Sequence, residues 1–320
     1  MKKLTMIVPC YNEGEVLPLF YDETSKVLKG LDSKYDYELL FVDDGSGDDT
    51  LKKIMSFAEK DEKVKYISFS RNFGKESAMY AGLKMSEGDY VGLIDADLQH
   101  SPELIPDMLK AVDEEGYDVA ASRRTDRKGE GGIKSFLSSQ FYKVINKISD
   151  TYIDDGAQDF RIMSRKVVDA ILEMTEKVRF TKGIFSWVGF NTKWFAHENR
   201  ERAAGTSKWS LRKLIKYAGD GILGFTTKPL KWPIYLGLIS LILALAELIV
   251  IICLSVGGTI SVLNHLILLS VLLIGGVTLV SIGVGGMYLA RTYTETQNRP
   301  VFIVSKTNIE KITIKAYNIF

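Results

Sequence analysis

The chain has 320 residues and a formal net charge of +1. This length suits one large domain or two modest ones, and the near balance of charge argues against a polyanionic partner, so no binding to nucleic acid is expected. The two cysteines, Cys10 and Cys253, lie in regions of different composition and read as small apolar residues, which argues against a disulfide framework.

Composition divides the chain into four segments. Residues 1–209 are mixed and charged, 210–231 have an amphipathic pattern, 232–291 are almost wholly apolar, and 292–320 turn polar again. No secretory signal opens the chain, because its first apolar run is short and acids follow it closely. We therefore expect a cytosolic domain, an interfacial helix, a membrane anchor and a cytosolic C-terminal tail, in that order.

Within the first segment, expected strands alternate with expected helices. Apolar runs predict strands at 6–9, 37–42, 64–69, 90–94 and 118–121. Apolar residues at helical spacing predict helices at 16–28, 50–60 and 76–85, and a further helix begins at Ser101-Pro102. This order is typical of an α/β fold with a mostly parallel, doubly wound sheet.

Acidic residues follow three of these strands. Glu13 follows the first, Asp43 and Asp44 the second, and Asp95 and Asp97 the fourth. Because ligands in such sheets bind at the carboxyl ends of the strands, we expect these acids to form one site. Clustered carboxylates suit Mg²⁺ or Mn²⁺, with substrate phosphate oxygens completing the coordination. No G-x-G-x-x-G or G-x-x-x-x-G-K-[ST] occurs at these turns, which argues against dinucleotide and P-loop chemistry.

Four motifs together carry a resemblance to a known family. They are Val8-Pro-Cys-Tyr-Asn-Glu13, Val42-Asp-Asp-Gly-Ser46, Arg71-Asn-Phe-Gly-Lys75 and Asp95-Ala-Asp-Leu-Gln99. In order and spacing they resemble the inverting family 2 glycosyltransferases of GT-A fold, and within them the polyprenyl-phosphate branch of dolichol-phosphate mannose synthases and bactoprenol glucosyltransferases. The resemblance runs from about residue 4 to about residue 300.

The resemblance implies roles for individual residues in these motifs. Residues expected to bind the nucleotide sugar are Pro9, Tyr11, Glu13, Val42, Asp44, Asp95 and Ala96. Residues expected to hold the metal and the donor diphosphate are Asp95, Asp97 and Gln99, of which Asp97 is also expected to be essential for catalysis.

Residues 122–210 are expected to receive the acceptor. The resemblance implies that Arg123, Lys134 and Ser138 hold a lipid phosphate, and the planar guanidinium of Arg123 suits such a group. A solvated basic loop is the alternative interpretation of residues 122–128. Lys134 stands where some relatives carry Arg.

Asp159 lies in the segment Asp154-Asp-Gly-Ala-Gln-Asp-Phe-Arg161. By analogy with other inverting glycosyltransferases it would be the catalytic acid–base. A phosphomonoester acceptor has a second pKa of about 6, so it is largely ionised at neutral pH and gains little from a base. Asp159 is therefore expected to act either as acid–base or in positioning, and a helix cap is the structural alternative.

The resemblance also places Arg202 and Lys208 on the donor diphosphate. A diphosphate leaving group gathers negative charge as the glycosidic bond breaks, and a metal with two cations would stabilise that charge where it develops. The alternative interpretation is an ordinary charged surface loop.

Two long apolar runs, about 233–257 and 263–290, each exceed the ~20 residues needed to cross a ~30 Å hydrocarbon core. The loop between them has no Lys or Arg, whereas basic residues flank the pair, so both termini are expected in the cytoplasm. Glu247, in mid-span, is expected to face a partner helix, within the hairpin or in an oligomer.

The segments that flank the two runs have patterns of their own. Residues 210–227 have apolar residues at helical spacing and a basic side, which predicts a helix in the plane of an anionic membrane, with a core-facing helix as the alternative. Residues 299–304 are expected to form a strand that returns to the soluble domain or to a neighbouring subunit.

The resemblance thus implies inverting transfer of a sugar from UDP-glucose or UDP-N-acetylglucosamine to a polyprenyl phosphate, undecaprenyl phosphate in a bacterium, for cell-envelope glycosylation. It also implies a homo-oligomer, a tetramer in relatives. Three alternatives stay open: a GDP-mannose-using synthase, a processive polysaccharide synthase, and a non-catalytic membrane adaptor. The processive relatives carry Q-x-x-R-W and usually more spans, and no Q-x-x-R-W occurs here.

Overall fold

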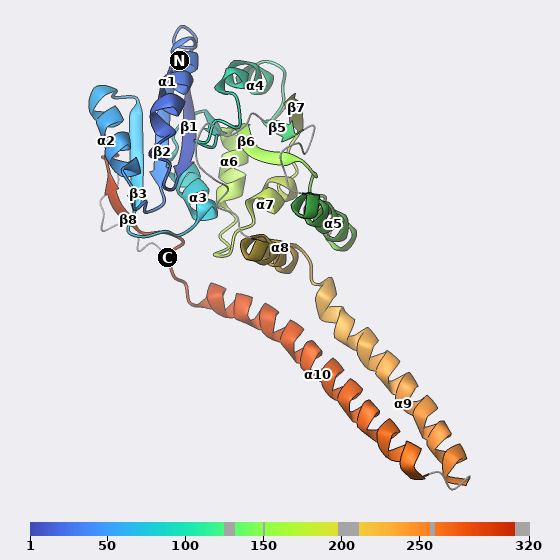
Figure 1. The fold of residues 1–320 in the computed structure, drawn as a ribbon. Helices are drawn as coiled ribbons and strands as arrows, with labels where there is room; N and C mark the ends of the chain where they lie inside the picture. Colours follow the sequence, from blue (N-terminus) through green and yellow to red (C-terminus); the bar gives the residue numbers. More distant parts are fainter. Residues whose placement is uncertain (125–131, 150, 198–210, 257–259, 311–320) are drawn as a thin grey trace.

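The computed structural model describes residues 1–124, 132–149, 151–197, 211–256 and 260–310. Within these ranges one sheet of eight strands has the order β7-β5-β6-β4-β1-β2-β3-β8 (Figure 1). The strands are β1 Lys2–Cys10, β2 Tyr35–Asp43, β3 Val64–Phe69, β4 Tyr90–Leu93, β5 Val119–Arg124, β6 Ala157–Ser164, β7 Thr192–His197 and β8 Val304–Thr307. The expected α/β class is confirmed.

The centre of the sheet, β4-β1-β2-β3, is parallel and buried on both faces. Successive residues of β2 alternate between two apolar cores, with Leu39 and Phe41 in one and Leu40 and Val42 in the other. This explains why the strands read as continuous apolar runs, which is typical of parallel sheets with two covered faces.

Helices cover both faces of this sheet. One core receives apolar side chains of α1 (Leu17–Lys29), α2 (Thr50–Lys60) and α4 (Ile105–Asp113), which follows the short η1 (Pro102–Leu104). The other core receives those of α3 (Lys75–Met85), α6 (Arg165–Leu172) and α7 (Thr181–Trp187). The remaining helix of this domain, α5 (Gly132–Ile148), packs against α8 (Leu211–Phe225).

Two strands run against the parallel direction. β6 is antiparallel to both β4 and β5, and β8 is antiparallel to β3. β6 and β7 lie outside the strands expected from sequence. β8 comes from the C-terminal tail, where Phe302 stacks on Phe69 with ring centroids 5.1 Å apart. The strand expected at 299–304 instead spans Val304–Thr307, and of its two expected destinations the structure has the soluble domain, where it is an edge strand of the sheet.

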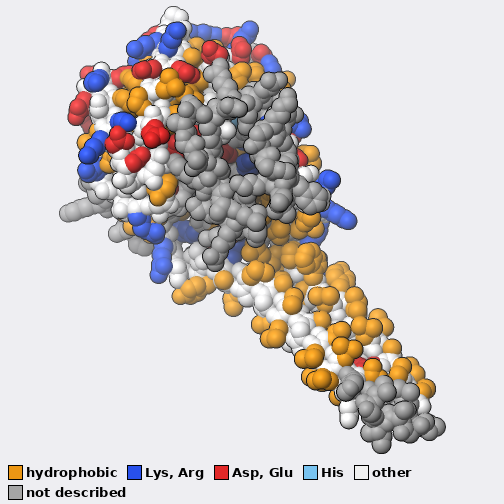
Figure 2. Space-filling model, viewed as in Figure 1, with side chains coloured by type: hydrophobic (Ala, Val, Ile, Leu, Met, Phe, Trp, Pro, Cys, Tyr) orange, Lys and Arg blue, Asp and Glu red, His pale blue; other side chains and the backbone are white. Residues whose placement is uncertain are grey.

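A helical hairpin extends from the globular domain. It consists of α9 (Trp232–Val256) and α10 (Ile260–Thr296), preceded by η2 (Lys228–Lys231). Two candidate membrane spans, Lys228–Val250 and Leu266–Thr296, match the two expected apolar spans. Figure 2 shows apolar side chains along the hairpin, with Lys and Arg side chains where it meets the globular domain. A helix of 37 residues is ~55 Å long, so α10 exceeds a ~30 Å hydrocarbon core and its last turns reach that domain.

The amphipathic helix α8 lies between the globular domain and the hairpin (Figure 1). In its described half, Tyr217, Ile222 and Phe225 pack with Phe180 and Phe141 in a small apolar cluster. Its apolar side in this half therefore faces the globular domain, which corresponds to the core-facing alternative. The helix is held to that domain by packing, and contact with a membrane surface remains a prediction.

Glu247 of α9 is paired within the hairpin. The Ser270 hydroxyl of α10 donates a hydrogen bond to Glu247 Oε1 at 2.5 Å and also lies 2.7 Å from the Leu266 carbonyl oxygen. The first of the two expected roles, a polar contact inside the hairpin, is therefore present.

Substitutions of the two partners in this contact should change the stability of the hairpin in opposite directions. Ser270→Ala should destabilise the hairpin by about 1 kcal/mol, because hydrogen bonds between membrane helices are worth roughly 0.6 to 1.7 kcal/mol and Glu247 loses this donor. Glu247→Leu should instead stabilise it by about 1 to 2 kcal/mol, because it removes a costly polar group from an apolar environment. Unfolding in mixed detergent micelles measures both, and equal signs for the two variants would contradict this reading.

Candidate active site

Lys75 joins two acids at the carboxyl edge of the sheet. Its Nζ lies 2.7 Å from Asp95 Oδ1 and 2.6 Å from Asp159 Oδ2. Asp95 follows β4 and Asp159 lies on β6. These strands are antiparallel with Leu93 opposite Arg161, so the pairing register carries Asp159 to the loop that holds Asp95. The structure therefore brings together two acids predicted to belong to one site, and adds a cation between them.

The charge of Asp159 is fixed by its neighbours. Burial raises the pKa of this carboxyl, but Lys75, Lys182 and Arg161 outweigh burial and hold the pKa well below its usual range. Burial lowers the pKa of Lys75, and the carboxylates of Asp159 and Asp95 outweigh that effect, so this pKa lies above its usual range. At neutral pH Asp159 is thus an anion with little affinity for a proton, and Lys75 is a cation.

Asp97 is held by a sharp turn of the chain. Its Oδ1 accepts a hydrogen bond from the Gln99 backbone N–H at 3.1 Å. Between them, Leu98 has φ +57°, a conformation that is unusual for leucine, and its side chain is buried. Ala96 is buried as well, whereas Asp95 and Asp97 are partly exposed. The turn thus presents both carboxylates at the surface of the same loop.

This pair of carboxylates fits a hard divalent cation. No three His, Cys, Asp or Glu side chains of the described residues form a group that could hold a metal ion by themselves. Mg²⁺ is usually bound by one or two carboxylates with waters and substrate phosphates, rather than by an all-protein cage. Asp95 and Asp97 meet that description, and a donor diphosphate would have to complete the coordination.

The loops after β1 and β2 are tied to each other. The Asn12 backbone N–H donates to Ser46 Oγ at 2.9 Å, and the Gly47 N–H donates to Asn12 Oδ1 at 2.8 Å. Tyr11 is 38% exposed and Pro9 and Glu13 are partly buried, so all three have surface beside these loops. Their positions are compatible with the expected nucleoside site.

The other two residues expected at the nucleoside are buried. Val42 is fully enclosed in the core, so only its backbone can reach a ligand. Asp44 is 3% exposed, and its carboxylate accepts the backbone N–H groups of Phe73 at 2.6 Å and Gly74 at 2.9 Å. Burial raises the pKa of Asp44 to about 6 despite these bonds. In the structure Asp44 anchors the turn at Gly74, whose φ of +99° favours glycine, just before α3 begins.

The residues expected to bind phosphate groups are described only in part. Arg123 Nε lies 3.3 Å from Asp154 Oδ1, and the Arg123 side chain is half exposed. Lys134 and Ser138 lie on α5, but their side chains are outside the described part of the structure, and so are Arg202 and Lys208.

Sequence reasoning missed the cations beside Asp159. Lys75 ends a recognised motif, but the sequence gives no reason to place it between two acids. Lys182 lies in a stretch of aromatic residues that reads as core packing. Burial lowers the pKa of Lys182, and Tyr142 and Asp159 outweigh burial and raise it. Both roles depend on the β4–β6 pairing, which single-sequence periodicity does not reveal.

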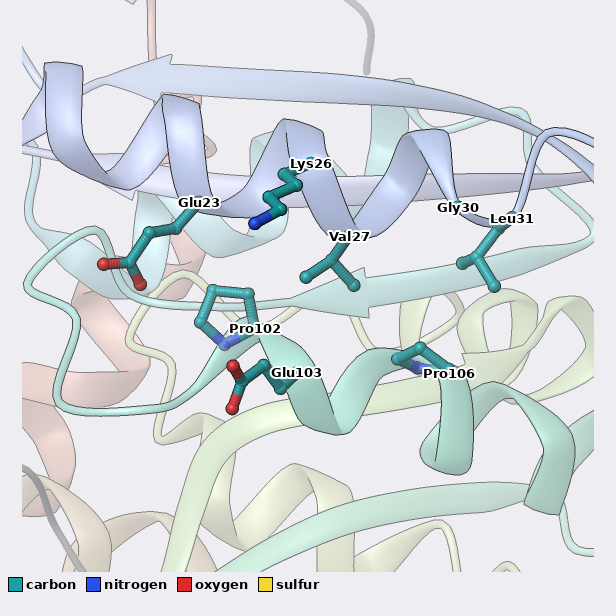
Figure 3. Close-up of a pocket in the computed structure, with 8 residues that line it drawn as sticks. All are labelled: Glu23, Lys26, Val27, Gly30, Leu31, Pro102, Glu103 and Pro106. Carbon is teal, nitrogen blue, oxygen red and sulfur yellow. The ribbon is translucent and has the colours of Figure 1, made fainter.

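Two hollows differ in their relation to this site. A cavity of about 410 Å³ is lined by Arg161 and Lys182, two of the cations that act on Asp159, together with Phe185. A larger one, of about 600 Å³, lies between α1 and the helices after the Asp95 loop, with Glu23 among its lining residues (Figure 3). Among the described residues, none of those predicted for the site lines either hollow, but two cations beside Asp159 line the smaller one, so we assign the site to the edge that carries Asp95 and Asp159.

Comparison with known proteins shows which family the chain belongs to. Residues 5–172 match the family described as Glycosyl transferase family 2. The chain is 40% identical over 308 residues to the SfII prophage-derived bactoprenol glucosyl transferase of Shigella flexneri, covering 96% of this chain and 98% of that one. It is 39% identical over 306 residues to the prophage bactoprenol glucosyl transferase homolog of Escherichia coli K12, covering 95% and 99%.

Among solved structures, glucosyl-3-phosphoglycerate synthase from Mycobacterium tuberculosis, crystallised with Mn²⁺, UDP and its product, is similar with a TM-score of 0.49 and 18% identity, over 69% of this chain and 78% of that one. The resemblance expected from the four sequence motifs is confirmed by the family match and by the near full-length relatives. This chain is a glycosyltransferase of GT-A fold and belongs to glycosyl transferase family 2.

Proposed function

We propose that this glycosyltransferase transfers glucose from UDP-glucose to a membrane polyprenyl phosphate, undecaprenyl phosphate in a bacterium, with inversion at the anomeric carbon. The observation that carries the proposal is the extent of the match. Relatives named bactoprenol glucosyl transferase align with 94 to 96% of the chain, so the likeness includes most of the hairpin and is not confined to the catalytic domain. UDP-N-acetylglucosamine is the alternative donor.

In the proposed reaction, an oxygen of the lipid phosphate attacks the anomeric carbon from the side opposite the nucleotide. The bond to the nucleotide diphosphate breaks, its electron pair leaves with the diphosphate, and an α-linked donor gives a β-linked sugar-phosphate lipid. Mg²⁺ or Mn²⁺, held by Asp95 and Asp97 with Gln99 beside them, would supply positive charge at the leaving diphosphate. Arg202 and Lys208 are proposed to supply further positive charge there.

The remaining residues are proposed to bind and orient the two substrates. Pro9, Tyr11 and Glu13 have exposed surface and are proposed to contact the nucleoside, and Val42 and Asp44 are proposed to support the loops beneath it. Arg123, Lys134 and Ser138 are proposed to receive the lipid phosphate. The basic residues Lys228 and Lys231, exposed at the base of the hairpin, favour a cytoplasmic position for the catalytic domain and both termini.

Asp159 is proposed to position the acceptor and its neighbouring lysines. A general base is most effective when its pKa lies near the working pH, and the pKa of Asp159 is held far below that by Lys75, Lys182 and Arg161. The phosphate acceptor, with a second pKa of about 6, is the stronger base of the two. It needs no partner to remove a proton at neutral pH.

Asp159→Asn should therefore lower kcat by about 10- to 100-fold, which is the range expected for lost positioning. Steady-state rates with the labelled donor measure the loss. Asp169→Asn, an exposed aspartate on α6, is the matched control and should stay within about twofold, as expected for a surface change. A loss as large as that of Asp97→Asn would show that Asp159 acts as the base.

The proposal is tested by incubating the purified protein with labelled nucleotide sugars, Mg²⁺ or Mn²⁺, and polyprenyl phosphate. Label from UDP-glucose in a chloroform-soluble, mild-acid-labile product supports it. Transfer only from GDP-mannose would make the protein a mannose synthase, and label in a polymer would make it a processive synthase. Donor binding without any product would identify a non-catalytic adaptor.

A further inference from the structure

We propose that Glu76 is a positioning residue that couples the base of the hairpin to Lys75 and Lys182, the two lysines beside Asp159. The active site described above includes Lys75 and Lys182, and the proposed transfer reaction assigns no role to Glu76. The activity arm of the test rests on the proposed transfer to a polyprenyl phosphate, whereas a second arm does not.

Glu76 connects three helices. It lies on α3 next to Lys75, and its Oε2 accepts the Thr181 backbone N–H at 3.0 Å and the Thr181 hydroxyl, both at the start of α7. The Tyr217 hydroxyl of α8 hydrogen-bonds to the same carboxyl group. Burial, with a contribution from nearby Asp159, raises the pKa of Glu76 to about 7. A carboxyl in such surroundings is costly to bury, and these hydrogen bonds compensate for it.

The base of the hairpin binds two of the same segments. Arg291 of α10 donates to the Asp220 carbonyl oxygen of α8 at 3.1 Å and to the Val178 carbonyl oxygen at 2.9 Å. Glu295 of α10 accepts the Lys177 backbone N–H at 2.9 Å. One route therefore runs from α10 through α8 to Tyr217, and the other through residues 177–181. Both end on Glu76.

On the other side of Glu76 are charged groups of the proposed active site. Its neighbour Lys75 contacts Asp95 and Asp159, and Lys182, the neighbour of Thr181, acts electrostatically on Asp159. Glu76 thus sets the distance between the start of α3 and the start of α7, and with it the placement of two lysines around one acid. Because a misplacement of about 1 Å can cost ~100-fold in rate, this contact is expected to act on turnover rather than on donor binding.

The first arm compares full-length variants in vesicles of phosphatidylethanolamine and phosphatidylglycerol that contain polyprenyl phosphate. Glu76→Gln keeps the shape of the side chain, and it should lower kcat at least tenfold while the donor KM changes less than twofold. Tyr217→Phe should lower kcat about three- to tenfold. The controls remove the same groups elsewhere: Glu38→Gln, a buried carboxylate bound by Thr5, and Tyr21→Phe, whose hydroxyl binds Asp61. Both should stay within twofold.

A double-mutant cycle tests the route. Glu76→Gln with Tyr217→Phe should be within twofold of Glu76→Gln alone, because the amide keeps only one acceptor oxygen for the donors of Thr181 and Tyr217 and so already weakens the link that Tyr217→Phe removes, whereas Glu76→Gln with Tyr21→Phe should be additive. The inference would be overturned if the separate kcat losses of Glu76→Gln and Tyr217→Phe multiplied in the double variant. It would also be overturned if the donor KM rose in step with the fall in kcat.

The second arm needs no turnover. Hydrogen exchange of the amides of residues 181–187 should be at least tenfold faster in Glu76→Gln than in the unsubstituted protein, and unchanged in Glu38→Gln. Equal exchange in Glu76→Gln and the unsubstituted protein would overturn the inference. If the unsubstituted protein transfers no sugar to polyprenyl phosphate, the proposed function fails, and the exchange comparison still decides the role of Glu76.

Discussion

Asp97→Asn should abolish measurable transfer, with a loss in kcat of about 10³-fold or more. The substitution keeps the size of the side chain and its acceptor oxygen for the Gln99 N–H, so the turn at Leu98 is preserved. It removes one of the two negative charges on the proposed cation site. Losing the positive charge at a leaving diphosphate costs several kcal/mol in the transition state, and 4 kcal/mol corresponds to roughly 10³-fold.

The activation by metal and the rate of transfer should both be lost in this variant. Titration with Mn²⁺ should give saturable activation of the unsubstituted protein and none of Asp97→Asn up to millimolar metal. Asp107→Asn, an exposed aspartate in the first turn of α4, is the matched control and should retain both rate and metal response. Normal turnover of Asp97→Asn, or a low rate with an unchanged metal response, would contradict the assignment of Asp97 to the metal.

The part of the fold that sequence predicts well is the part in which neighbours in the chain are neighbours in the sheet. β1, β2 and β3 pair in order, and β4 joins the free edge of β1, so apolar runs and strand-end acids were sufficient to place Glu13, Asp44 and Asp95 at one edge. Parallel pairing carries every strand end to the same side, and it needs no knowledge of side-chain contacts.

The parts that sequence reasoning missed depend on pairings between distant segments. The sequence predicts no strand at β6, because Asp159 and Arg161 interrupt its apolar pattern, although Phe160 and Ile162 are fully buried. Its antiparallel insertion between β4 and β5 places Asp159 beside Asp95. The contact of Glu76 with Thr181 spans 105 residues and leaves no periodic signal in either segment.

Lys75→Met should change Mn²⁺ binding and turnover in opposite directions. Lys75 lies 2.7 Å from Asp95, a proposed metal ligand, and 2.6 Å from Asp159. Without this cation Asp95 loses a competing positive charge, so Mn²⁺ should bind the nucleotide-free protein more tightly, by about three- to tenfold for a charge pair in a partly exposed site. Turnover should nevertheless fall by about 10²- to 10³-fold, because Asp95 and Asp159 then repel each other and Asp159 loses its main counter-charge.

If Mn²⁺ binding strengthens while turnover falls, the role of Lys75 goes beyond forming stabilising ion pairs with Asp95 and Asp159. Mn²⁺ binding is measured by electron paramagnetic resonance or calorimetry on the nucleotide-free protein, and kcat by the transfer assay. Lys63→Met removes a lysine that pairs with Asp32 at the opposite edge of the sheet, where the parallel strands begin. Mn²⁺ binding and kcat should both stay within about twofold in this variant, as expected for an exposed ion pair. Weaker Mn²⁺ binding in Lys75→Met would mean that Lys75 organises the metal site rather than competing for it. Unchanged turnover would mean that its bridge between Asp95 and Asp159 has no part in the reaction.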